Sequence, residues 1–370
     1  MHISASPAWD SWSAVSARLP ADLDLDELSR NTKAIQRRRG NGIEDGATLL
    51  RLSLAHGPGG KSLQETAAWA RLAGVAELTA QSLNERLHRS VAFLAALTHR
   101  LLLGRGSGAG SVWAGRSVSI ADGSSLSQPG STGTDWRLHG VYDLGRGGFR
   151  HIEVTTRTGG ESLLRGTPAE GEVVIADRGY AKAKDLQACL DPAGAQARDF
   201  IVRVGWKALA LRDADGAPFS LIDQIRTLPE GTAPKEWAVQ AVVGGKRQET
   251  LLPVRLIAVP LPAEKAATNR QKLKRKASKH QDRSDPRSVL AAGFMLLVTS
   301  LPTDIPPAEI CAAYRLRWQI ELAFKRLKSL LRIDCLPTRT EPGSLSWLYA
   351  HLILLLLIED LCQDFLDSPP

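Results

Sequence analysis

Two near-copies of one short pattern constrain the fold of this chain more than any other feature. The segments "SVSIADGSS" and "EVVIADRGY" each run through β-branched and apolar residues to Ala-Asp and then reach turn residues. Such runs predict two buried strands, the first ending at Asp122 and the second at Asp177. Sites in α/β sheets are assembled at the carboxyl ends of strands, so both acids are candidate site residues. For either aspartate alone, ordinary turn chemistry is the better explanation, and the two near-copies together with Glu321 favour a site.

The neighbouring segments favour a mixed α/β region. "WRLHGVYDL", "RHIEVTT" and "DFIVRVGW" are typical of strands, and "KAKDLQACL" is typical of a helix. A β-hairpin is predicted around "GGKRQ", and "GFMLLVTS" again has the composition of a buried strand. The Gly/Ser-rich stretch "GRGSGAGS" (104–111) precedes this region and is interpreted as a linker that marks a domain boundary.

Residues 1–103 are predicted to be helical. Ser62 and Glu65 have the spacing of a capping box, and Gly74 divides the segment that follows into two helices. This outline is typical of a helix-turn-helix, in which Arg86 and Arg89 of the second helix are candidates for DNA contact. An ordinary helical hairpin fits the short pattern equally well.

The charge balance indicates an anionic partner. The 370 residues carry a formal charge of +8, and nucleic acid is the commonest partner of such chains. Two clusters, "TKAIQRRRG" and "EKAATNRQKLKRKASKHQDRSDPR", are suited to phosphate contact, although a solvated segment has the same composition.

Other bulk features make several classes of protein improbable. Four scattered cysteines form no metal-binding or disulfide pattern, which indicates reduced thiols in a cytoplasm. The N-terminus does not resemble a signal peptide. The apolar run in "WLYAHLILLLLIEDLC" is shorter than a membrane span needs, so we expect a buried C-terminal helix and no membrane partner.

A third acid lies in the basic stretch "YRLRWQIELAFKRLK". No Pro or Gly interrupts Ile310–Leu331, and the composition predicts one helix. At about 100° per residue, Tyr314, Arg317, Glu321 and Lys328 fall within an arc of roughly 60°. Periodicity alone favours an exposed, salt-bridged helix face, so the two aspartates elsewhere are what make Glu321 a candidate site residue.

Convergence of three carboxylates requires cations between them. Asp122, Asp177 and Glu321 offer the oxygen ligands that Mg²⁺ prefers. Two such ions about 4 Å apart can activate a water or a 3′-hydroxyl for attack on a phosphodiester. The pattern therefore predicts two Mg²⁺ ions, with Mn²⁺ as a substitute, and neighbouring Arg and Lys side chains that hold the DNA backbone.

These motifs together resemble a known family. "YRLRWQIELAFKRLK" matches a Y-x2-R-x3-E-x6-K signature, and the segments "DGSS" and "IADRGY" resemble the contexts of that family's two aspartates. Over about residues 110–335, the chain resembles the DDE transposases of bacterial insertion sequences, in the insertion sequence four family.

The resemblance implies an α/β fold with a ribonuclease-H-like mixed sheet, a mostly β insertion and a preceding helical domain. It implies a helical DNA-binding domain at 1–103, a catalytic domain in two parts at 111–206 and 291–370, and a β-rich insertion with a basic loop at 207–290.

It also implies cut-and-paste transposition at terminal inverted repeats, followed by strand transfer into target DNA. Asp122, Asp177 and Glu321 are then the catalytic metal ligands. Tyr314, Arg317 and Lys328 contact the double-stranded transposon end, in a homodimer that works in the bacterial cytoplasm on the nucleoid.

Two alternatives remain open from the residues alone. The first is a metal-dependent nuclease on the same fold that lacks strand transfer. The second is a catalytically inactive or domesticated protein that binds specific DNA sequences. Tyr314 and Lys328 argue against the first, and the intact acids argue against the second.

Overall fold

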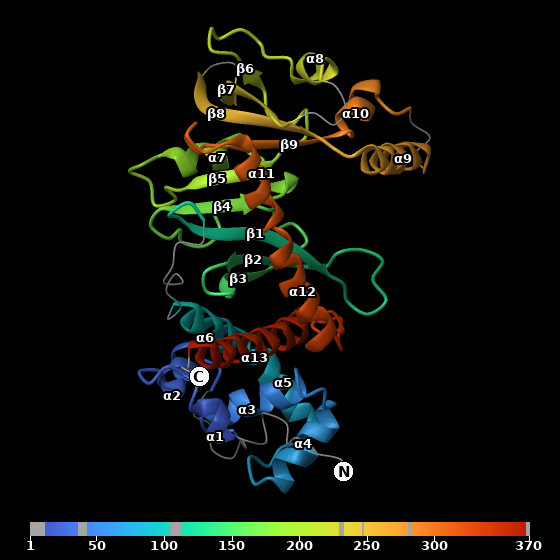
Figure 1. The fold of residues 1–370 in the computed structure, drawn as a ribbon. Helices are drawn as coiled ribbons and strands as arrows, with labels where there is room; N and C mark the ends of the chain where they lie inside the picture. The colour runs from blue at the N-terminus through green and yellow to red at the C-terminus, as the bar shows by residue number, and fades with distance from the viewer. Residues whose placement is uncertain are drawn as a thin grey trace.

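The computed structural model describes residues 12–35, 43–103, 105, 113–228, 233–245, 248–279 and 283–367. Its first part is helical, as predicted, and lies at one end of the molecule (Figure 1). The cluster "TKAIQRRRG" and most of the predicted linker lie largely outside the described residues. The N-terminal helices are α1 (Trp12–Ser16), α2 (Leu25–Asn31), α3 (Gly46–His56), α4 (Leu63–Leu72), α5 (Ala80–Arg89) and α6 (Val91–Leu103).

The predicted helix pair of the N-terminal part is confirmed. Ser62 and Glu65 form a reciprocal capping box at the start of α4. Gly74 lies between the helices at a φ of +63°, a conformation that glycine adopts without strain. The prediction that Arg86 faces DNA is wrong, because its side chain lies in the interior; Arg89 is exposed.

The rest of the described chain contains a single mixed sheet of nine strands, with the order β3-β2-β1-β4-β5-β9-β8-β7-β6, and further helices. Helices α11 (Pro307–Arg315) and α12 (Trp318–Leu330) run across one face of it (Figure 1). The strands are β1 (Ser117–Leu126), β2 (Trp136–Asp143), β3 (Gly148–Thr156), β4 (Glu172–Ala176), β5 (Asp199–Arg203), β6 (Leu211–Arg212), β7 (Lys235–Gly245), β8 (Gln248–Pro260) and β9 (Phe294–Thr299).

The register between β1 and β4 determines where the two aspartates lie. The two strands are parallel, and their last pair is Ala121 with Ala176. Asp177 follows the end of β4, as predicted. The prediction that Asp122 ends its strand is wrong: β1 continues to Leu126 because its other edge pairs with β2 beyond this point. Asp122 is thus the residue at which β1 separates from β4.

The strands predicted for the insertion extend the central sheet. The hairpin of β7 and β8 forms as expected, and β8 pairs along its other edge with β9. The basic segment after β8 forms a helix, α9. The remaining helices here are η1 (Arg178–Tyr180), α7 (Ala183–Leu190), α8 (Leu221–Arg226), α9 (Ala263–Lys279) and α10 (Pro286–Ala291).

The predicted single helix over Ile310–Leu331 is two helices, α11 (Pro307–Arg315) and α12 (Trp318–Leu330). At the junction, the backbone N–H of Arg317 bonds to the carbonyl of Tyr314, three residues earlier. This i→i−3 pattern tightens the backbone and interrupts the α-helical ladder without Pro or Gly. The Arg317 side chain projects from this junction toward the sheet.

The predicted buried C-terminal helix is confirmed as α13 (Glu341–Asp367), which packs between the N-terminal helices and the β3 edge of the sheet. By length and composition, the stretch Glu341–Cys362 also qualifies as a membrane span, but half of its most apolar window is buried inside the protein. Arg105, from the predicted linker, is buried against this helix, where it contacts Glu359 and Asp360 at 2.6 and 2.8 Å.

Candidate active site

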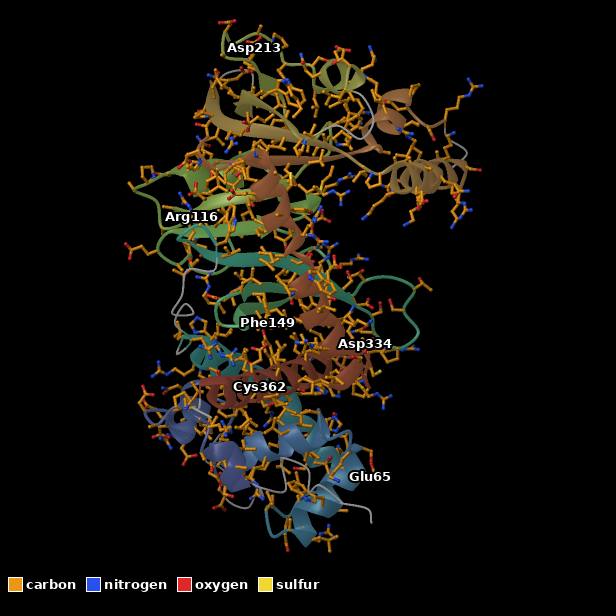
Figure 2. The ribbon with its side chains drawn as sticks, in the orientation of Figure 1. Glu65, Arg116, Phe149, Asp213, Asp334 and Cys362 are labelled. Atoms are coloured by element: carbon orange, nitrogen blue, oxygen red, sulfur yellow. The ribbon has the colours of Figure 1, made fainter. Side chains whose placement is uncertain are left out.

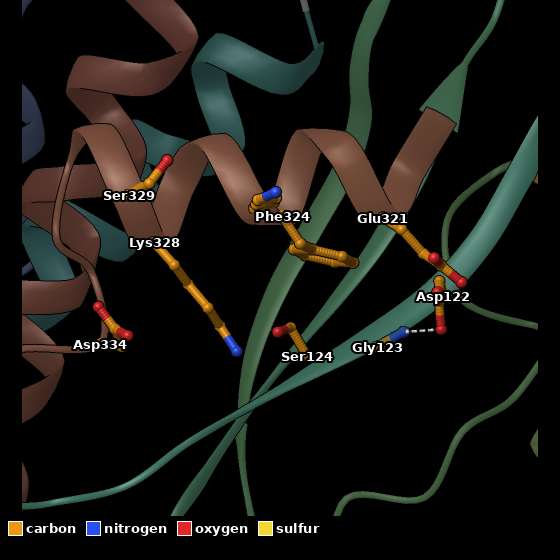
Figure 3. A pocket seen from close by; sticks show the side chains of 9 residues that line it. Asp122, Gly123, Ser124, Glu321, Phe324, Lys328, Ser329 and Asp334 are labelled. Atoms are coloured by element: carbon orange, nitrogen blue, oxygen red, sulfur yellow. Dashed lines mark hydrogen bonds between the residues drawn. The ribbon is translucent and has the colours of Figure 1, made fainter. Parts of the chain in front are cut away.

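Three separate elements bring the predicted acids to one place. Asp122 is on β1, Asp177 lies between β4 and η1, and Glu321 is in the first turn of α12. Helix α12 lies against β1, so its Glu321 and Lys328 side chains both project toward that strand (Figure 3). The structure therefore brings together residues that are far apart in the sequence.

Arg317 links two of the acids directly. Its Nη1 lies 3.2 Å from Oδ2 of Asp122, and its Nη2 donates a hydrogen bond to Oε1 of Glu321. Tyr314, one turn earlier, has its hydroxyl 3.4 Å from Oδ1 of Asp177. A single guanidinium can reach two carboxylates only when these lie close together, so Asp122 and Glu321 are neighbours.

Of Tyr314, Arg317 and Lys328, only Lys328 makes no direct contact with the three acids. Its Nζ donates to the backbone carbonyl of Ser125 at 3.1 Å, which holds the ammonium over the end of β1. All six predicted site residues therefore lie along one face where α11 and α12 cross the strands.

Burial shifts the protonation equilibria of the site. Desolvation raises the pKa of Asp122 to about 6; the hydrogen bond from the Gly123 N–H and the charge of Arg317 oppose this shift. Burial, followed by the charge of Asp177, raises the pKa of Tyr314 to about 12. Burial lowers the pKa of Arg317, but the bond to Glu321 together with the charges of Tyr314, Glu321 and Asp177 outweighs it, and the net shift is upward. Arg317 is thus a permanent cation at the site.

An open cleft of about 490 Å³ lies beside Asp122 and Glu321. Sequence reasoning missed several of its lining residues, although helical spacing carried a signal for one: Lys325 lies one turn after Glu321, on the same side of α12. The lining residues are Asp122, Gly123, Ser124, Glu321, Phe324, Lys325, Lys328, Ser329 and Asp334.

The donor set fits a hard divalent cation in chemistry. Its ligands would be carboxylate oxygens, which Mg²⁺ and Mn²⁺ prefer to nitrogen or sulfur. Within the described ranges, no three His, Cys, Asp or Glu side chains are grouped closely enough to form a ready metal site. Arg317 provides the positive charge between Asp122 and Glu321, so metal binding there requires its guanidinium to move aside.

The site combines carboxylates with Arg and Lys side chains in an open cleft near the carboxyl ends of β strands. This combination is typical of enzymes that act on phosphodiester bonds. Residues 113–357 match the family described as Transposase DDE domain, and the chain belongs to this family. DDE transposases generally use divalent metal ions. The chain is a DNA-cleaving and strand-transferring enzyme of this type, as its motifs predicted.

Curated relatives agree over nearly the whole chain. A protein named for insertion sequence element IS186A of Escherichia coli (strain K12) is 38% identical over 362 residues, which covers 98% of this chain and 96% of the relative. The transposase for insertion sequence element IS421 of Escherichia coli is 38% identical over 363 residues, with the same coverage. These names are consistent with the insertion sequence four family.

Among solved structures, the chain is similar to a piggyBac transposase synaptic complex with hairpin DNA. The TM-score is 0.48 at 8% identity, and the match covers 95% of this chain and 74% of the other.

Proposed function

We propose that this transposase catalyses Mg²⁺-dependent cut-and-paste transposition, with cleavage at terminal inverted repeats and strand transfer into target DNA. The observation that carries the proposal is the shared guanidinium of Arg317, which contacts both Asp122 and Glu321. These contacts lie beside the carboxyl end of β4, which Asp177 follows. The clustering of these carboxylates is costly unless cations separate them.

In this proposal Asp122, Asp177 and Glu321 hold two Mg²⁺ ions, for which Mn²⁺ substitutes. When bound, the ions supply an activated water or 3′-hydroxyl and stabilise the leaving oxygen. The protein's own cations orient the DNA: Lys328 holds a backbone phosphate beside β1, and Arg317 exchanges its carboxylate partners for phosphate oxygens. Arg is suited to this exchange because its planar donors match phosphate and carboxylate equally well.

The fold has parts with distinct tasks in the same proposal. The central strands form a ribonuclease-H-like core, contained in 111–206 and 291–370, and 207–290 is the insertion. The helical part, 1–103, binds the transposon end, with Arg89 as an exposed cation on the second helix of the pair. Two copies act as a homodimer on paired ends, in the bacterial cytoplasm on nucleoid DNA.

The decisive experiment uses purified protein and a labelled element end that carries flanking genomic DNA, with EDTA or with Mg²⁺. Wild-type protein is expected to cleave only with Mg²⁺ and to join the freed end to a target plasmid. Asp122→Asn is expected to abolish cleavage while DNA binding is retained. Asp334→Asn is the matched control, because this acid lines the same cleft and is exposed.

The outcomes separate the alternatives. Cleavage without joining of a precleaved end would indicate a nuclease, and specific binding without cleavage in Mg²⁺ or Mn²⁺ would indicate an inactive DNA-binding derivative. Unchanged cleavage by Asp122→Asn would end the proposal that this carboxylate is catalytic.

A further inference from the structure

A second cavity, of about 300 Å³, lies beyond Asp177. Two arginines line it, and both are close to Asp177: Arg178 is the next residue, and Nη1 of Arg203 lies 3.7 Å from Oδ1 of Asp177. The lining residues are Arg178, Arg203, Gly205, Trp206, Asn269, Leu273, Ser288, Ala291, Ala292 and Leu296. None of them lines the cleft that contains Lys328.

Strand order places the two cavities on opposite sides of the acids. Lys328 bonds to β1, which carries Asp122; the next strand, β4, leads to Asp177. The next strand again is β5, parallel to β4, and its last residue is Arg203. Across neighbouring strands, Lys328 therefore lies first, the two aspartates lie next, and Arg203 lies beyond them.

The arginines of this second cavity have unused hydrogen-bonding capacity. Nε of Arg203 is buried and has no hydrogen-bond partner, and Arg178 makes no ion pair with any residue that the structure describes. Two guanidiniums that line one cavity favour an anion between them, because their donors fit phosphate oxygens.

Helix α9 extends this positive surface. Asn269 and Leu273 face the cavity, and exposed lysines recur at helical spacing along the side of α9 that borders Asn269. Figure 2 shows the nitrogen-tipped side chains gathered on this helix. The exposed lysines of this stripe are Lys265, Lys272, Lys276 and Lys279. A row of exposed cations on a rigid helix suits the regularly spaced phosphates of a duplex.

We propose that Arg178, Arg203 and the lysine stripe of α9 bind the DNA backbone on the far side of the scissile phosphate from Lys328. The inference rests on the proposed function, since it takes the acids as the cleavage point. If Lys328 contacts the transposon end, DNA that continues past the acids reaches Arg203 and then α9. That DNA is the flanking duplex before excision or the target duplex at integration, and both present the same phosphodiester chemistry.

Binding assays in EDTA test the inference independently of cleavage. The labelled probes are an end that stops at the cleavage point, the same end with flanking duplex attached, and a target duplex offered to protein that already holds the precleaved end. The variants are Arg178→Gln and Lys272→Gln. Lys274→Gln is the matched control, because this exposed lysine lies on the opposite side of α9 from the stripe.

Each of the two variants is expected to weaken one of the longer complexes on the order of threefold to tenfold and to reduce its salt slope by about 1. Affinity for the end that stops at the cleavage point, and all binding by Lys274→Gln, should be unchanged. Loss with flanking duplex assigns the surface to flank, and loss with target duplex assigns it to target. Equal losses for all three probes, or no loss for any, would overturn the inference. Failure of cleavage with unchanged differential binding would count against the proposed chemistry alone.

Discussion

Asp122 and Asp177 are the residues immediately beyond the last pair of the parallel β1–β4 ladder, Ala121 with Ala176. Neighbouring parallel strands lie about 4.8 Å apart, so the ladder itself places the two carboxylates side by side. Glu321 lies on helix α12, which packs against β1, and Arg317 pairs with both Glu321 and Asp122. The site is thus organised by backbone register first and by side-chain ion pairs second.

The raised pKa of Asp122 predicts a stability trade-off. Because its pKa is about 6 in the folded protein and ordinarily 3.8 in an unfolded chain, the folded state binds this proton more tightly, and the carboxylate destabilises the fold above pH 6. In EDTA at pH 8, Asp122→Asn should increase the free energy of unfolding by about 2 kcal/mol. The gain should vanish below about pH 4. Urea titrations at several pH values measure this; a variant less stable than wild type at pH 8 would contradict it.

Because Arg317 pairs with both Asp122 and Glu321, we expect its guanidinium to compete with metal ions for these carboxylates. Arg317→Gln removes the cation between Asp122 and Glu321, so the metal-free site keeps two unscreened carboxylates. We expect this variant to bind Mn²⁺ more tightly than wild type in the absence of DNA, yet to cleave poorly because a phosphate contact is lost. Isothermal titration with Mn²⁺ provides the first measurement. Weaker metal binding by the variant would show that the guanidinium supports the site instead of competing for it.

We expect removal of the buried cation of Arg105 to lower the free energy of unfolding strongly. Its side chain is 2% exposed and pairs with Glu359, whose pKa is raised by burial. Arg105→Ala leaves the partly buried Glu359 carboxylate without its ion pair and should cost about 3 kcal/mol of stability. Arg100→Ala is the matched control; its pair with Asp22 is 41% and 68% exposed and is worth less than about 1 kcal/mol. Equal losses in chemical denaturation would refute the distinction.

His351 predicts acid sensitivity. Burial lowers its pKa to about 4, and its Nδ1 lies 2.8 Å from the Trp347 carbonyl on α13. The unfolded chain binds this proton near pH 6.5 and the folded chain only near pH 4, so stability falls as pH decreases through this window, by up to about 3 kcal/mol. His351→Gln should flatten the decrease. His139, whose pKa burial also lowers to about 4, acts in the same direction. A pH profile unchanged in His351→Gln, measured by denaturant titration, would contradict the assignment.

Much of the local structure was predictable because its causes are local. The capping box of Ser62 and Glu65, the strands that lead to the two aspartates, and the burial of the C-terminal helix all follow from residues within a few positions of one another. Where local reasoning failed, a partner elsewhere decided the outcome. β1 continues past Asp122 because β2 pairs with it, and Arg86 is buried because other helices cover it.

The sequence by itself determined the residue types of the site and their family, since Asp122, Asp177 and the signature from Tyr314 to Lys328 are recognisable as motifs. Only the tertiary structure decided that these residues meet, that Arg317 bridges two of the acids, and that Arg203 lies beyond them on the neighbouring strand. The reason is physical: motif spacing records order along the chain, whereas distance between side chains depends on strand order, register and burial. Those arise only when distant segments pack together.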